Sequence, residues 1–419
     1  MSDAPDVGAA EEPGPSGTLA VLRQRDFGVY FVGNSLSNVG TWFQNLAAAI
    51  LVYRLTRSAF LVGLVNFAQF IGAFLLAAPA GVAADRFDRR RLLIATQTVA
   101  AVVTGGLAVL VLLDLASAPL VIAAAFLLGL ALAFMVPALL ALVPLLVAPR
   151  DLDTAVGLNS LTFNLARAVG PVLAAAVIAR ADLGTAFAIN AASFLVFIAA
   201  LLVIRPRPQE RTTGPRPRLL DTLRMVWADR RLRALLLAVV AVSTTTDPVN
   251  TLTPVFATEV LGRPDTTTGL LVGAFGAGAT LTALTLTGWL RQQPRVLVVA
   301  MVVEGVGMLV FAAARTLPLA LLGMAIAGAG FLAAITRATA RIQTEVADGQ
   351  LGRVMALWSL AFIGTRPLAA LVDGAVAERF GAPAAAALLA VPAIVGAVAV
   401  GRELAGARAE AAAIDPSRS

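Results

Sequence analysis

Four charged residues lie inside or beside long apolar segments of this chain, where a charge requires a physical explanation. They are Arg167, Asp247, Glu304 and Arg366. A charge at membrane depth costs about 2.5–3.5 kcal/mol on insertion scales, so each of these groups should pair with another charge or face water. The chain has no cysteine and no histidine, so any proton transfer has to use Asp or Glu. These residues therefore predict proton exchange or the recognition of a charged solute.

Each of these charges also has a static interpretation. In the functional interpretation, Asp247 or Glu304 takes up and releases a proton, while an arginine tunes that exchange or meets an anionic substrate. In the static interpretation, the charges form a buried ion pair or anchor a helix kink, because Asp247-Pro248 and Arg366-Pro367 both interrupt helices. Both interpretations stay open for Asp247 and Arg366.

The same composition argues against an enzyme. Without cysteine and histidine there are no thiol nucleophiles, imidazole bases or common zinc ligands. The sequence contains no metal-binding cluster, nucleophile–base set or phosphate-binding loop, and its glycine-rich stretches lie inside apolar spans. All 32 basic residues are arginines, which in a membrane protein mark loops and do not indicate nucleic-acid binding. We therefore expect no enzymatic activity, no cofactor, no metal and no nucleic-acid partner.

The elements that must position these charges are membrane-spanning helices. Hydrophobic residues make up 59% of the 419, and charged residues only 14%, too few to cover a soluble surface. About 20 apolar residues cross a bilayer as a helix, and the runs do not alternate as barrel strands do. The sequence therefore predicts an all-α membrane protein with twelve spans, at 27–53, 59–84, 92–113, 115–149, 154–179, 183–204, 234–258, 266–290, 296–314, 316–336, 354–372 and 380–401.

The distribution of arginines predicts the orientation. With the N-terminus inside, 24 of the 32 arginines fall in cytoplasmic segments and 6 in outside loops. The positive-inside rule then places both termini in the cytoplasm of a bacterial cell, with the chain in the inner membrane. A monomer with the lipid bilayer as its surroundings is the expected state.

The chain divides into two halves around a hydrophilic middle. We expect a disordered tail at 1–18, a six-helix half at 19–204, a cytoplasmic linker at 205–232, a second six-helix half at 233–402 and a cytoplasmic tail at 403–419. Within the linker, apolar residues recur at helical spacing from Leu219 to Trp227, which is typical of a short helix on the inner leaflet. A solvated linker is the alternative.

The two halves also repeat each other weakly. Phe163-Asn-Leu-Ala-Arg167 is echoed 199 residues later by Phe362-Ile-Gly-Thr-Arg366, which makes the two arginines pseudo-equivalent. Polar residues recur at helical spacing in the first span of each half, as expected for helices that flank a shared cavity. Trp42 is a candidate for stacking on an aromatic substrate, with ordinary packing as the alternative. The candidate cavity residues are Asn34, Asn38, Thr41, Trp42, Asn45, Asn164, Arg167, Asn250 and Arg366.

The loop between the second and third spans carries a motif. It reads Gly81-Val-Ala-Ala-Asp85-Arg86-Phe-Asp-Arg89-Arg90-Arg. This segment resembles the motif of the loop between the second and third helices of the major facilitator superfamily. Five residues of this chain match positions of that motif: Gly81, Asp85, Arg86, Arg89 and Arg90. Such a motif would let the helix of Gly81 pack closely and would act as a charged latch on the cytoplasmic face. A plain positive-inside loop is the alternative.

Other segments resemble one branch of that superfamily, the twelve-helix drug and siderophore exporters, which include enterobactin-exporter-like and macrolide-efflux-like proteins. They include Arg25-Asp26-Phe27 and Gly352-Arg353-Val354-Met355, and Gly170-Pro171 is similar to the antiporter motif of the superfamily. The resemblance implies two pseudo-symmetric six-helix bundles in which the third and sixth helices lie outside the cavity, which favours a static role for Glu304. The span 115–149 lacks the arginine that many proton-driven members carry, so their coupling scheme cannot be transferred.

These observations predict a secondary active transporter. The expected function is proton-coupled efflux of a small amphipathic compound, such as a drug, a siderophore or a secondary metabolite, by alternating access. The alternatives are an importer or facilitator, a lysolipid transporter of the same fold, and a membrane scaffold or sensor that transports nothing.

Overall fold

The computed structural model describes residues 17–208, 219–285, 295–346 and 348–414. Most of the expected N-terminal tail, part of the linker 205–232, the end of the span 266–290 and the last residues of the C-terminal tail lie outside this range. In the described residues every regular element is a helix, so the chain is an all-α protein, as the sequence predicts.

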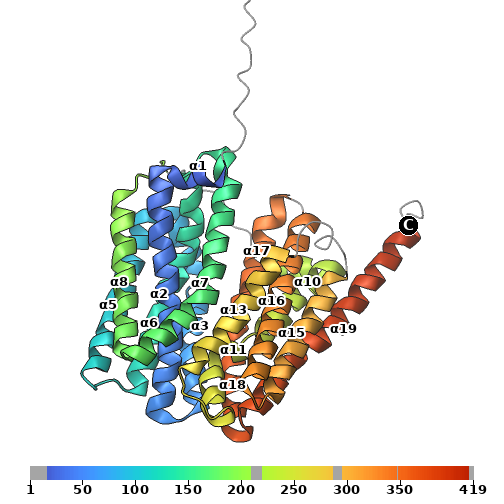
Figure 1. Ribbon diagram of the computed structural model, residues 1–419. Coiled ribbons are helices and arrows are strands. Elements are labelled where there is room, and N and C mark those ends of the chain that lie inside the picture. The colour runs from blue at the N-terminus through green and yellow to red at the C-terminus, as the bar shows by residue number, and fades with distance from the viewer. Residues whose placement is uncertain (1–16, 209–218, 286–294, 347, 415–419) are drawn as a thin grey trace, which may run out of the picture.

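The first half is a bundle of nearly parallel and antiparallel helices (Figure 1). Its elements are α1 Thr18–Arg23, α2 Arg25–Thr56, α3 Ala59–Leu75, α4 Ala77–Arg86, α5 Arg89–Leu112, α6 Ala118–Leu142, η1 Val143–Leu145, η2 Pro149–Asp151, α7 Leu152–Arg180 and α8 Leu183–Val203. The bundle is held together by contacts of α2 with α7 and α8, of α5 with α6 and α8, and of α3 with α6.

The second half is built in the same way. Its elements are α9 Leu219–Ala228, α10 Arg230–Thr245, α11 Pro248–Thr251, α12 Thr253–Val255, η3 Phe256–Val260, α13 Thr267–Thr285, α15 Val296–Ala313, α16 Leu317–Glu345, α17 Asp348–Ile363, α18 Arg366–Phe380 and α19 Ala382–Ile414. Here α15 and α16 pack on each other, and α19 packs on α10 and α15.

Ten helices in the described part of the chain are long and apolar enough to cross a membrane. Two expected spans are not among them. The 32-residue helix α2 carries a polar stripe that lowers its mean hydropathy, and the second span is divided into α3, which is apolar but short, and α4. Counting α2 and the α3–α4 pair makes the architecture consistent with twelve spans.

Prolines explain where spans are interrupted. A proline removes a backbone donor, and its ring clashes with the carbonyl four residues earlier. Helix α3 ends at Leu75, four residues before Pro79. Helix α17 ends at Ile363, four residues before Pro367. Pro248 likewise comes just after α10 ends at Thr245. The breaks place Asp247 and Arg366 at the start of new helical segments.

The halves meet along two reciprocal seams. The second helix of each half packs on the fifth helix of the other, which pairs α3 with α18 and α13 with α7. Glycines make this possible, since a Cβ added at Gly63 would lie 2.3 Å from the Ala370 carbonyl oxygen, and one at Gly276 would lie 2.4 Å from the Cα of Ala168. The backbones therefore touch directly across both seams.

The two ends of the molecule differ. Figure 1 shows the halves close together at the lower end and farther apart at the end that carries α1. We call the latter the α1 end, and it also carries the turn between α4 and α5 and the C-terminal part of α19. The other is called the opposite end, where Arg54 at the end of α2 forms a salt bridge with Asp265, just before α13.

Two expected boundaries run through helices. The linker 205–232 contains α9, which packs on α10 and α17, buries Val226 and exposes Trp227, and the expected end of the linker at 232 falls inside α10. The C-terminal helix α19 continues to Ile414, so the tail that we expect from 403 begins inside a helix.

The glycine seam gives a first prediction. Gly276→Ala should destabilise the protein by about 1–3 kcal/mol, because the new methyl group would overlap the backbone of α7. Thermal unfolding of the purified protein measures the effect. Gly106→Ala is the control, because a Cβ at Gly106 meets nothing within 4 Å. Equal unfolding temperatures for the two variants would show that the seam is not tightly packed.

Candidate functional site

A cavity of about 210 Å³ lies where the two halves face each other. The first half supplies most of its lining, from α2, α3, α5, α6, α7 and α8, and the second half adds Asn250, Phe362 and Arg366. Amide groups, aromatic rings and two guanidinium groups line it together. The polar and charged lining residues are Asn38, Thr41, Gln44, Asn45, Gln69, Thr96, Arg167, Asn250 and Arg366.

Most of the polar stripe on α2 faces this cavity. Asn38, Thr41, Trp42 and Asn45 line it, since they follow one another along one face of the helix. Asn34, one turn earlier, is buried instead and donates a hydrogen bond to Oδ1 of Asn159 at 3.4 Å. The side chain of Asn164 lies outside the part that the structure describes.

The antiporter-like motif fixes the position of Trp42. A Cβ added at Gly170 would lie 2.7 Å from the Cβ of Trp42, so only glycine lets α7 approach α2 this closely. Pro171 and Trp42 also line a small neighbouring cavity of about 20 Å³ that reaches Asn250. Gly170 and Pro171 therefore shape the wall of the cavity and do not supply a polar group to it.

Arg167 lies among aromatic rings from three other helices. Its guanidinium carbon is 4.5 Å from the ring centre of Phe331, 4.8 Å from that of Phe275 and 5.9 Å from that of Trp42. Cations are attracted to the faces of aromatic rings, and the attraction grows when water is excluded. Only 8% of Arg167 is exposed, so the rings replace much of its hydration.

Arg366 is held in the same way. Its guanidinium carbon lies 4.8 Å from the ring centre of Phe362 and 5.1 Å from that of Phe70. Its Nε is buried and has no hydrogen-bond partner. Among the described residues, neither Arg366 nor Arg167 forms a salt bridge or a hydrogen bond through its guanidinium group. The static ion-pair interpretation therefore does not describe this structure.

The buried acids lie behind the cavity wall. Glu304 is fully buried and accepts a hydrogen bond from Thr246 at 2.8 Å, while Asp247 is 2% exposed and accepts one from Thr251 at 2.9 Å. Each carboxylate keeps one oxygen without a hydrogen-bond partner. Neither acid belongs to the cavity lining, and in the described residues neither lies within salt-bridge distance of Arg167 or Arg366.

Sequence reasoning missed a buried acid on the helix that begins at Arg366. Asp373 is fully buried on α18, and neither of its carboxylate oxygens has a hydrogen-bond partner. The span expected at 354–372 stops one residue before it. The spacing could have revealed it, because Asp373 follows Arg366 by seven residues, which is two helical turns on the same face.

Two arginines of the loop motif bind helix ends within the first half. Arg89 donates to the carbonyl oxygen of Ala141 at 2.9 Å, and Arg90 donates to the carbonyl oxygens of Leu201 and Leu202, the latter at 2.6 Å. These carbonyls lie at the C-terminal ends of α6 and α8, where arginines complement both the free acceptors and the helix dipole.

The remaining motif residues divide as follows. The prediction that Gly81 allows close helix packing is wrong in this structure, because a Cβ added there would meet nothing within 4 Å. Arg86 is exposed, and the side chain of Asp85 lies outside the described part of the chain. The latch between the halves therefore stays a prediction.

The opposite end carries contacts between the halves that the sequence did not suggest. Arg54 binds Asp265 through two nitrogens, with Nε–Oδ2 at 2.5 Å and Nη2–Oδ1 at 2.9 Å. The hydroxyl of Tyr53 donates to Glu259, and Glu378 accepts from the Ser58 hydroxyl at 3.2 Å. These residues lie in loops or at helix ends far apart in sequence, so no local pattern marks them.

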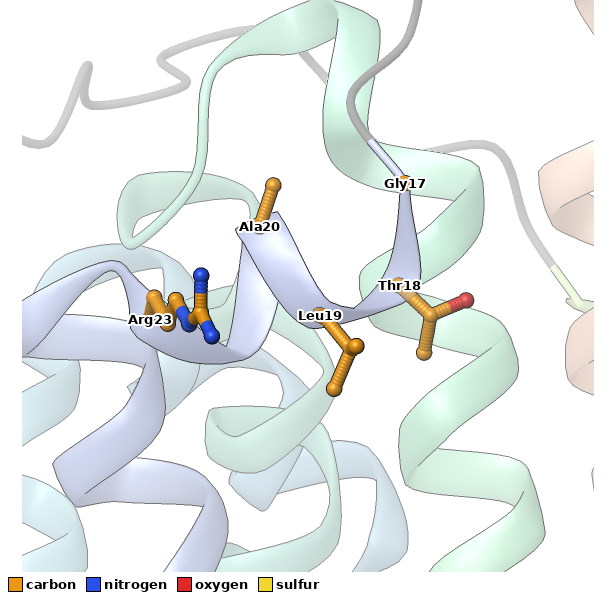
Figure 2. Close-up of a pocket in the computed structure, with 5 residues that line it drawn as sticks. All are labelled: Gly17, Thr18, Leu19, Ala20 and Arg23. Carbon is orange, nitrogen blue, oxygen red and sulfur yellow. The ribbon is translucent and has the colours of Figure 1, made fainter.

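A larger hollow of about 740 Å³ lies at the surface beside α1 (Figure 2). Its lining is Gly17, Thr18, Leu19, Ala20 and Arg23, with one charged group and no aromatic ring. Its described lining comes only from α1 and the residue before it, so we do not assign it a function.

The fold and the cavity define a membrane transporter of the major facilitator type, not an enzyme. Residues 16–419 match the sequence model of the transmembrane secretion effector family, MFS_3, and the chain belongs to that family. The fold is shared with the nucleoside transporter NupG, at a TM-score of 0.72 and 15% identity over 90% of this chain and 99% of that one. The fold is also shared with a bacterial homolog of the human lysosomal transporter Spinster in an inward-facing and occupied conformation. The TM-score is again 0.72, at 13% identity over 90% of this chain and 96% of that one.

Similar proteins include siderophore transporters. The chain is 27% identical to the enterobactin exporter EntS of Citrobacter koseri over 347 residues, which is 80% of each protein. It is also 30% identical to the staphyloferrin A transporter of Staphylococcus aureus over 177 residues, 42% of this chain and 44% of that one.

The arginine contacts at the α1 end give a second prediction. Arg90→Ala should destabilise the protein by about 1.5–3 kcal/mol, because charge-assisted hydrogen bonds to two helix-terminal carbonyls are lost. Chemical unfolding of the purified protein measures this change. Arg91→Ala is the matched control, since Arg91 is exposed on the same turn. If both variants lost the same stability, the carbonyl contacts of Arg90 would be unimportant.

Proposed function

We propose that this protein exports a small amphipathic compound across the bacterial inner membrane by alternating access. The observation that carries the proposal is the cavity between the halves, to which each half contributes one arginine from pseudo-equivalent positions. Such a cavity lets either half close over a bound solute. The similarity to siderophore transporters over up to 80% of the chain supports a siderophore-like or related secondary metabolite as the substrate.

The arrangement of the two ends supports an assignment of state. With both termini in the cytoplasm, the α1 end faces the cell interior and the opposite end faces outward. The ion pair of Arg54 with Asp265 and the contact of Tyr53 with Glu259 then close the outer side. This is the arrangement of an inward-facing transporter that is ready to take up its substrate from the cytoplasm. One chain supplies all of the described cavity lining, so a monomer suffices for the proposed transport.

Proton exchange would use Asp247 or Glu304. Both acids are buried next to a threonine hydroxyl and near an arginine of the cavity, so a change of their protonation alters the charge behind the binding site. Protons entering from outside would return the emptied transporter to its inward-facing state. The charged loop at Asp85–Arg90 would act as the latch of the cytoplasmic side.

Loss of the gene tests the proposed function directly. Deletion should remove one or a few compounds from the culture medium while the cells retain them, and plasmid-borne expression should restore secretion. Comparative mass spectrometry of medium and cell extract measures both pools, and a drug-susceptibility panel covers toxic substrates. Unchanged profiles in both assays would contradict export.

Everted membrane vesicles test the direction and the coupling ion. The compound identified by deletion should accumulate inside such vesicles when their lumen is acidic. Asp247→Asn or Glu304→Gln should reduce this accumulation at least tenfold, because the exchangeable proton is lost, while equilibration without a pH gradient persists. Asp114→Asn is the matched control, since Asp114 is exposed and its left-handed backbone suits asparagine. A pH dependence that survives in both single variants would rule out these acids.

Disulfide crosslinking tests alternating access. The natural chain has no cysteine, so Arg54→Cys with Asp265→Cys introduces a single pair across the halves. A bis-methanethiosulfonate reagent that spans the length of the lost arginine side chain should link the pair and abolish export, and reduction should restore it, because the outer side can no longer open. The control joins Leu112→Cys with Gly184→Cys inside the first half, where these residues are in contact. Full export by the crosslinked Arg54–Asp265 pair would refute the mechanism.

A further inference from the structure

We infer that the substrate is an organic anion with an aromatic or apolar body, bound between Arg167 and Arg366. The inference rests on the proposed transport function and narrows its substrate class. Both arginines line the same cavity, one from each half, and neither has a carboxylate partner within salt-bridge distance in the described residues. A solute that carries a negative charge would supply the missing partner to both.

The way the arginines are held leaves their terminal N–H groups without a partner in the described residues, whereas the Nε of Arg366 is buried. A guanidinium group is planar, with its five N–H groups directed outward in the plane. Aromatic rings within 4.5–5.9 Å of the guanidinium carbons support these cations. Rings cannot replace oxygen acceptors for the N–H groups, and a carboxylate or phenolate oxygen can. The rings therefore hold each cation in place for an acceptor that comes from outside the protein.

The protein's own acids do not fill this role. Glu304 and Asp247 are bound by Thr246 and Thr251 and stay outside the cavity lining. Asp373, the third buried acid nearby, also lies outside the lining. In the described residues none of these carboxylates bonds to either guanidinium group.

The rest of the lining indicates the body of the ligand. Aromatic and aliphatic side chains cover most of the wall, with Phe70, Phe163 and Phe194 among them. Asn38, Asn45 and Asn250 add neutral hydrogen-bonding groups. A cation would meet two guanidinium groups and no lining carboxylate, so the cavity selects against positive solutes. An amphipathic anion fits every part of this lining.

A matched set of probes tests the inference. Purified protein is titrated with 2-naphthoate, 2-naphthamide and 2-naphthylmethylammonium, which share one ring system and differ in charge. Naphthoate should bind at least about tenfold more tightly than the amide, a difference of about 1.4 kcal/mol, and the ammonium compound most weakly. Arg167→Gln and Arg366→Gln should each remove this preference and leave amide binding within about threefold.

Three controls make the outcome decisive. Arg167→Lys and Arg366→Lys keep the charge and should retain part of the preference for the anion, which separates lost charge from misfolding. Arg180→Gln removes an exposed arginine from the same helix as Arg167 and should change nothing. Equal binding of the three probes, absence of naphthoate binding or a preference that persists in both glutamine variants would overturn the inference. Anion binding without export in vesicles would instead contradict only the proposed function.

Discussion

Two arginines held on aromatic rings at membrane depth are the constraint on which the rest of the structure depends. Unpaired cations in this position are costly, and the fold compensates with rings from α2, α3, α13, α16 and α17. This arrangement brings side chains from both halves to one point. It explains why Gly170 must let α7 touch α2, since that contact sets Trp42 beside Arg167. A transporter that needs a free cation in its cavity has a reason to keep unpaired arginines at membrane depth despite their energetic cost.

In the proposed transport cycle the halves would move while the arginines stay at their interface, and the surrounding architecture is compatible with this movement. In both seams, glycines such as Gly63 and Gly276 lie against the backbone of the facing helix, which lets the halves approach closely. The spans that carry Asp247 and Arg366 are interrupted at prolines, which gives these charges helix ends that can adjust separately. Polar contacts at the opposite end, led by Arg54 with Asp265, add a reversible closure that water can replace. Within the first half, Arg89 and Arg90 bind helix-terminal carbonyls and keep that bundle rigid.

The sequence was sufficient for the fold because bilayer thickness and hydropathy act locally. Apolar length located the spans, and the repeat of Arg167 by Arg366 pointed to facing positions in the two halves. The polar spacing on α2 likewise pointed to Asn38, Thr41 and Asn45, which line the cavity. Contacts made in three dimensions were not accessible. Nothing in the sequence shows that rings from distant helices surround Arg167, or that Tyr53 meets Glu259. Asp373 was missed because a hydropathy window ends at a charge, although burial by neighbouring helices extends beyond it.

The central claim is that two rigid halves rock about the arginine-lined cavity, and distances between spin labels test it most directly. Cysteines for labelling can be placed on a chain that has none, at exposed positions Leu140 and Leu284 for the α1 end and Leu113 and Phe380 for the opposite end. Double electron–electron resonance would then measure both distances in nanodiscs at acidic and neutral pH, with and without 2-naphthoate. The account predicts that one distance shortens as the other lengthens. Two distances that stay constant under all conditions, or change in the same direction, would contradict it.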